Sequence, residues 1–201
     1  MISTVAGTGV KGFSGDGGPA TSAQLRRPHS IVFDQDGGLL ICDIGNHRIR
    51  RVDLTTGTIS TFGGTGEQAP TPDGAALRGT PLNGPRAMAL DPDGSVYLAL
   101  RKGNAIYRID LSSETIHLVA GTGEQGYSGD GEAALRATLA GPKGLAYSAD
   151  SFMWPTPRTS SCVGLISTPG SSAPCSAAVS AETDQSRARC AADSTVLMEF
   201  L

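Results

Sequence analysis

Three residues with a cationic or potentially cationic side chain recur at one position of a regular spacing. His29, Arg86 and Lys143 each follow a proline, and they lie 57 residues apart. Equivalent positions of a repeat protein lie on a common surface, so these three predict a basic collar that would bind an anionic ligand. The alternative is an exposed position that accepts any polar residue.

A second recurring group is acidic. Asp16, Asp73 and Asp130 also lie 57 residues apart, and each precedes a glycine. Asp-Gly is typical of turns, because the carboxylate bonds to the backbone two residues further on. The functional alternative is an acidic ring on the loop face that binds Ca²⁺, which requires several oxygen ligands at one point. One carboxylate per repeat does not converge on one ion, so the turn is favoured and no metal site is predicted.

No catalytic constellation stands out in the sequence. The three histidines, His29, His47 and His117, show no spacing of metal ligands. The segment 7–9 is glycine-rich, but no helical pattern follows it, so it is not a phosphate-binding loop. The sequence therefore predicts no catalytic residue, no metal and no cofactor, and it favours a binding function while leaving an enzyme open.

The elements that must position these residues come from an internal repeat. Segment 2–9 returns at 59–66 and again at 116–123. Each unit holds four short apolar runs bounded by turn residues, which in the first unit are 30–33, 39–42, 48–52 and 58–62. Segments 2–5 and 144–147 are expected to be single strands of the flanking units. Four strands per repeat predict an all-β fold built from β-propeller blades.

The propeller geometry places several loops on one face. The loop that enters each first strand opens on the same side as the turn between strands two and three. The long inserts 9–27, 66–84 and 123–141 should therefore share a face with the turn 43–47. Loops on a rigid scaffold commonly carry binding residues.

Segment 28–53 resembles the NHL repeat, which takes its name from the step seen here as Asn46-His47-Arg48-Ile49. The inserts 12–20 and 126–134 resemble the long-loop bacterial branch and are similar to the NHL domain of teneurins. This resemblance covers residues 1–150 and implies a six-bladed propeller. The second unit departs from it, with Lys102-Gly103-Asn104-Ala105 at the signature. The signature side chains are therefore not needed for chemistry in every blade.

Composition and charge restrict the class of partner. The formal net charge is -3, which argues against a dedicated nucleic-acid binder. The resemblance adds one alternative, in which Arg48, Arg50 and Arg51 contact RNA phosphates, as arginines do in the animal tripartite-motif relatives. Only five Phe, four Tyr and one Trp are available to stack bases. The other interpretation is that these arginines pair with Asp43 or Asp53.

The sequence also bears on the setting of the chain. No apolar run reaches membrane-spanning length, and repeat sequence begins at Ile2, so no signal peptide is expected. The intact parent protein is expected to be extracytoplasmic or secreted. Two full units do not close a ring, so the chain is predicted to be a propeller fragment. Missing blades or self-association would cover its end faces.

After residue 150 the repeat is lost, and an irregular tail is predicted for 151–201. This segment holds two of the 27 glycines, and Ser, Ala and Thr fill 22 of its 51 positions. One interpretation is a disordered tail. The other is a frameshift, because synonymous codons for 152–159 and 163–170, read from the third base, encode YVADTEN and RIDLDTG. These strings match 40–46 and 51–57 at the native spacing, and the nucleotide sequence tests the idea.

The cysteines divide between the two regions. Cys42 is predicted to be a buried strand residue. Cys162, Cys175 and Cys190 lie in the predicted tail without the spacing of a zinc site, and they are expected to be exposed, unpaired thiols.

Together these observations predict an NHL-repeat binding or scaffold module. It would recognise a protein, a glycan or a small anionic ligand on its long-loop face. The alternatives are a fragment of a metal-dependent propeller enzyme of the lyase or lactonase type, and the sensor domain of a signalling protein.

Overall fold

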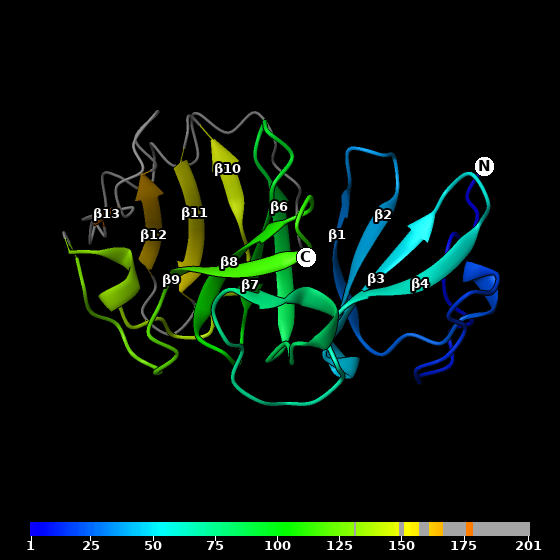
Figure 1. The fold of residues 1–201 in the computed structure, drawn as a ribbon, viewed down its shortest axis with the longest axis horizontal. Helices are drawn as coiled ribbons and strands as arrows, with labels where there is room; N and C mark the ends of the chain where they lie inside the picture. Colours follow the sequence, from blue (N-terminus) through cyan, green and yellow to red (C-terminus); the bar gives the residue numbers. More distant parts are fainter. Residues whose placement is uncertain (131, 149–150, 157–160, 167–175, 179–201) are drawn as a thin grey trace.

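The computed structural model describes residues 1–130, 132–148, 151–156, 161–166 and 176–178. Three antiparallel sheets stand side by side, and short 3-10 helices lie in the loops between strands (Figure 1). We call these sheets blades one, two and three. The described part of the chain contains no helix with the length and hydropathy needed to cross a membrane.

Blade one has its strands in sequence order. They are β1 Pro28–Phe33, β2 Leu39–Asp43, β3 Arg48–Asp53 and β4 Thr58–Gly63. The four predicted strands are therefore confirmed, with bounds that differ by at most two residues. Cys42 is fully buried in β2, as expected. The side chain of Arg50, on β3, is completely buried.

Blade two repeats this plan 57 residues later. Its strands are β6 Pro85–Leu90, β7 Val96–Leu100, β8 Ala105–Asp110 and β9 Thr115–Ala120. The insert adds a short edge strand, β5 Ala75–Ala76, which pairs with β9. The sheet order is thus β5-β9-β8-β7-β6.

Blade three extends beyond the predicted end of the repeat. Its strands are β10 Ala146–Ser148, β11 Ser151–Thr156, β12 Ser161–Ile166 and β13 Ser176–Ala178. This differs from the irregular tail expected after residue 150. The physical reason lies in Phe152 and Trp154, which alternate along β11 and are 2% and 1% exposed against blade two. The rest of the predicted tail, with Cys175 and Cys190, lies outside the described residues.

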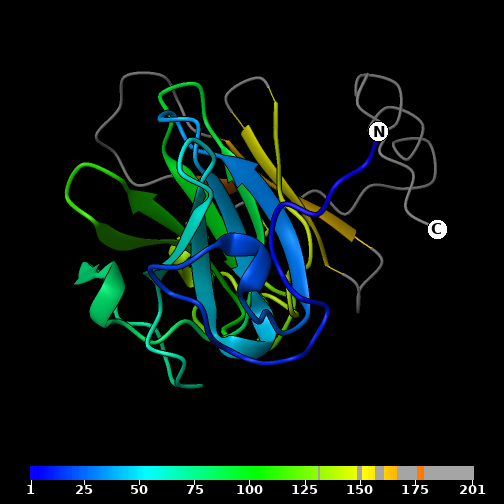
Figure 2. The ribbon, with the colours of Figure 1, turned by 90° about the vertical axis from the view of Figure 1, so that its right-hand side faces the viewer.

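The N-terminal segment 2–5 is not a strand, contrary to expectation. A fourth strand needs a third strand as its ladder partner, and no described segment offers one there. The following insert instead lies against the outward face of blade one (Figure 2). Ala20 and Ala23, around the helix η1 Ala20–Ser22, pack on Ile41 and Ile59.

Apolar clusters hold neighbouring blades together. One cluster joins Leu40 and Ile49 of blade one to Met88 and Leu98 of blade two. Strand β6 contacts β1 on one side and β10 on the other, so the first strands of the three blades are neighbours (Figure 1).

The signature residue His47 joins one blade to the next. It ends the helix η2 Ile44–Asn46 in a left-handed conformation, with φ 53°, and its Nδ1 lies 3.3 Å from the backbone nitrogen of Gly84 and 3.2 Å from the carbonyl oxygen of Leu82. Asn104 stands 57 residues later with φ 48°, and its Oδ1 accepts the N–H of Gly141 at 3.0 Å. Histidine and asparagine thus do the same structural task. The helices η3 Leu77–Gly79 and η4 Ala134–Arg136 are the counterparts of η1 in the next two inserts.

Candidate functional site

Two of the three predicted collar residues meet where β1 and β6 begin. His29 and Arg86 are each the second residue of their strand, and the two strands are neighbours. His29 is exposed at the surface, and its pKa is lowered by partial desolvation and by the charges of Arg86, Arg27 and Arg101. We call Arg27, His29, Arg86 and Arg101 the basic cluster.

Arg86 lies at the centre of this cluster and is half-buried. Its pKa is lowered by burial and by the positive charges of Arg101 and Arg27. Its Nε is buried and has no hydrogen-bond partner. No carboxylate within the described ranges forms an ion pair with any of the three arginines. No carboxylate in the described residues therefore neutralises the positive charges of the basic cluster.

Arg27 occupies a strained position at the entrance to β1. Its φ is 56°, and the equivalent residues of the next two repeats are Gly84 and Gly141, with φ 75° and 62°. A non-glycine residue in the left-handed region costs roughly 1–2 kcal/mol. Strain of this kind occurs preferentially at functional sites. Arg27 was not predicted from the sequence. The signal that could have identified it is an arginine where the next two repeats have glycine.

Arg101 was also missed by sequence reasoning. It directly follows β7, and its backbone N–H donates to the carbonyl of Gly84 at 2.9 Å, which fixes it beside the entrance to β6. Its counterpart in the first repeat is the apolar Ile44, so the change of residue type was the signal here. Lys143 precedes β10 and is exposed, and it is not among the charges that act on His29 or Arg86.

The predicted acidic residues do not meet one another. Asp16 binds the hydroxyl of Thr61 at 2.7 Å, and Asp73 accepts the backbone N–H of Leu118 at 2.7 Å. Each therefore ties its insert to the fourth strand of the same repeat. Asp130 is exposed in a turn. Among the described residues, no group of three or more His, Cys, Asp or Glu side chains could hold a metal ion.

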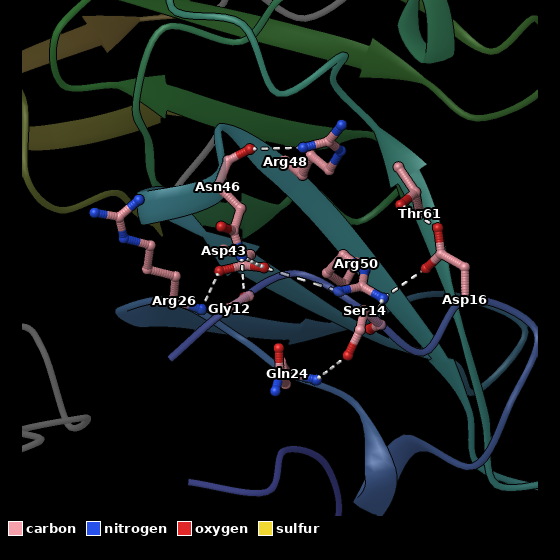
Figure 3. A network of polar contacts seen from close by, with 10 residues as sticks. All are labelled: Gly12, Ser14, Asp16, Gln24, Arg26, Asp43, Asn46, Arg48, Arg50 and Thr61. Carbon is pink, nitrogen blue, oxygen red and sulfur yellow. Dashed lines mark hydrogen bonds and ion pairs between the residues drawn. The ribbon is translucent and has the colours of Figure 1, made fainter. Parts of the chain in front are cut away.

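The arginines of the signature strand are held by blade one and its insert, as Figure 3 shows for Arg48 and Arg50. Arg50 donates to Asp16 at 2.5 Å and to the carbonyl of Ser14 at 3.2 Å, and its Nη1 lies 3.9 Å from Asp43. Arg48 donates to two backbone carbonyls, and Arg51 pairs with Asp34. Of the two predicted partners, Asp43 thus lies near Arg50. The hydrogen bonds of Arg48 and Arg51 are made with backbone carbonyls and with Asp34.

Asp43 is the fully buried carboxylate of this network. Burial raises its pKa, against the effect of hydrogen bonds from Asn46 and from the backbone N–H of Arg26. Asn46 also donates to the carbonyl of Gly12 at 2.7 Å, so the turn, the insert and strand β3 are bonded to one another. The network accounts for the signature residues as structural elements of the blade.

Comparisons with known proteins agree with this architecture. Residues 25–52 match the NHL repeat. The chain is 31% identical to Teneurin-m of Drosophila melanogaster over 150 residues, which is 68% of this chain and 5% of that protein. It is 30% identical to NHL repeat-containing protein 2 of Bos taurus over 101 residues, or 49% of this chain and 14% of that protein. The chain thus spans a small part of the length of these relatives.

Solved structures with a similar fold are β-propeller proteins. A protein of unknown function from Bacteroides thetaiotaomicron superposes with a TM-score of 0.56 at 21% identity, covering 63% of this chain and 32% of that one. An auxiliary nutrient binding protein from Bacteroides ovatus gives 0.52 at 20% identity, covering 67% and 36%. The number of blades and a bacterial origin stay predictions. The chain therefore carries an NHL repeat and has a β-propeller-type fold made of antiparallel sheets.

Proposed function

We propose that this chain is part of a ligand-binding β-propeller and that its basic cluster binds a small anion. The observation that carries the proposal is the position of His29 and Arg86 at the starts of the neighbouring strands β1 and β6, with Arg27 and Arg101 beside these starts and no carboxylate partner in the described ranges. Like charges gathered at one place repel one another, and an anion relieves that repulsion. Of the predicted partners, a small anion fits this arrangement better than a protein or a glycan.

The chemistry of the cluster favours an oxyanion. Guanidinium groups are planar, remain charged, and match the paired oxygens of a carboxylate or phosphate. The buried Nε of Arg86 has no partner, so a bound oxygen would satisfy a donor that is otherwise left unpaired. The strained backbone at Arg27 supports the same proposal, because glycine would fold there at lower cost.

Calorimetric titration with inorganic phosphate at low ionic strength tests the proposal. We expect saturable binding by the wild-type chain and binding weakened about tenfold to a hundredfold in Arg86→Gln, since a hydrogen bond to a charged group contributes roughly 1.5–3 kcal/mol. Arg78→Gln is the matched control, because Arg78 is an exposed arginine that pairs with Glu114. Equal affinity of the wild type and Arg86→Gln would refute the proposed site.

A further inference from the structure

Blade two contains a cavity at the place where blade one contains the polar network of Figure 3. The cavity has a volume of about 300 Å³ and lies beside the insert of blade two. Its wall includes Pro70, Asn83, Leu100, Lys102, Tyr107 and Leu118. Subtracting 57 from each number gives Phe13, Arg26, Asp43, Gly45, Arg50 and Thr61, most of which form or adjoin the network in blade one.

Side chains of blade one fill the equivalent space. The guanidinium carbon of Arg48 lies 4.0 Å from the ring centre of Phe13, and that of Arg50 lies 4.9 Å from it. In blade two these positions hold Ala105, Pro70 and Tyr107. The loss of the long Arg48 side chain and of the Phe13 ring leaves a space that blade two does not fill.

The charge of the wall also changes between the blades. Asp43, the buried acid of blade one, is replaced by Leu100, and Gly45 is replaced by Lys102. The ammonium group of Lys102 donates to the neutral amide of Gln68 at 2.8 Å, and no carboxylate in the described part of the chain pairs with it. Asp73, whose charge acts on Tyr107, is not part of the wall. The cavity wall therefore carries one positive charge, and the rest of it combines apolar side chains with polar ones such as Asn83, Tyr107 and Thr122.

We propose that this cavity binds a small carboxylate with an apolar body. Binding pockets are mainly apolar, with a few polar groups that orient the ligand. Leu100, Leu118 and Pro70 supply the apolar surface, and Lys102 supplies the positive charge. Liquid water would fill this volume with about ten molecules, so the ligand is no larger than a single substituted ring. This site adjoins the basic cluster, because Lys102 follows Arg101, but no residue of the cluster is part of the cavity wall.

Benzoate and its neutral analogue benzamide test the proposal on the full chain, with binding followed by NMR of the backbone amides. We expect saturable shifts at Gly103 and at 121–123 with benzoate, and at least tenfold weaker binding of benzamide. Lys102→Gln should remove this preference for the carboxylate. Ala105→Arg restores the arginine found in blade one, and it should abolish binding because its side chain occupies the cavity.

Arg86→Gln separates this site from the basic cluster, since it should weaken phosphate binding and leave benzoate binding unchanged. Absence of saturable shifts with benzoate would overturn the proposal, as would full benzoate affinity in folded Ala105→Arg. If Ala105→Arg does not fold, Lys102→Gln decides. An unchanged ratio of benzoate to benzamide affinity in that variant contradicts the assigned role of the lysine.

Discussion

At the residue scale, two repeat positions hold charged side chains in blade one and uncharged side chains in blade two. Blade one buries Arg50 together with Asp43, whereas blade two has Tyr107 and Leu100 in their places. The hydroxyl of Tyr107 donates to the carbonyl of Thr71 at 2.7 Å, as Arg50 donates to that of Ser14. Arg50 and Tyr107 therefore hold their inserts by equivalent backbone carbonyls. One repeat does so with a charged side chain and the other with a neutral one.

A double-mutant cycle tests that equivalence. Asp43→Leu alone should lower the free energy of unfolding by roughly 1–3 kcal/mol, because the buried donors of Asn46 and of the Arg26 backbone lose their acceptor and Arg50 loses the nearby charge. Arg50→Tyr alone should also destabilise, since it leaves a buried carboxylate. The decrease in the free energy of unfolding of the double variant should be smaller, by at least about 1 kcal/mol, than the sum of the two single decreases. Urea denaturation measures all three values. Strict additivity would contradict the coupling.

The lowered pKa of Asp34 predicts how the stability of the fold depends on pH. Burial would raise its pKa, but the hydrogen bonds from Arg51 and from the N–H of Gly38 outweigh that effect and hold the pKa below its usual value. The fold therefore gains stability above the unfolded pKa of 3.8 and loses it as pH falls through the lower folded pKa. Asp34→Asn should flatten the acid limb of a plot of unfolding free energy against pH. An unchanged limb would show that other carboxylates cause it.

At the element scale, the strands could be predicted from sequence and the cluster could be predicted only in part. Alternating apolar residues and the 57-residue repeat specify β1 to β4, because the pattern is local. The repeat also identified His29 and Arg86 as equivalent. Arg101 could not be placed by the repeat rule, because it follows a different strand and reaches the cluster only through packing. The strands after residue 150 were missed because glycine and turn signals are sparse there.

The turn that enters β1 combines strain with charge. Arg27→Gly should stabilise the fold by about 1 kcal/mol or more, because glycine adopts a positive φ without the steric cost. The same change removes one charge of the basic cluster, so it should weaken phosphate binding. In this variant the free energy of unfolding should therefore increase while the affinity for phosphate decreases. Loss of stability, or unchanged phosphate affinity, would contradict the assignment of Arg27 to the cluster.

At the scale of the whole molecule, the first strand of blade one has exposed apolar side chains, whereas the equivalent side chains of blade two are buried or half-buried. Ile31 and Phe33 are 58% and 60% exposed, whereas the equivalent Met88 is 4% exposed and Leu90 is half-buried against blade one. The same strand positions thus form an interface in one blade and a free surface in the other. Exposed apolar strand surface promotes association.

We therefore predict that the chain self-associates through blade one. Sedimentation velocity at increasing concentration should show oligomers for the wild type and mainly monomer for Ile31→Glu/Phe33→Glu. Leu135, on η4, is a large apolar residue that is 45% exposed, and Leu135→Glu should leave the association unchanged. A wild-type chain that stays monomeric at all concentrations would contradict this prediction.

The most direct test of the anion site is an NMR titration of His29 with and without phosphate. Partial burial and three arginines hold its pKa below the usual 6.5 in the free chain. A bound phosphate places negative charge beside the imidazole, so the pKa of His29 should rise by about one unit. A His29 pKa that is the same at saturating phosphate would contradict the proposed site.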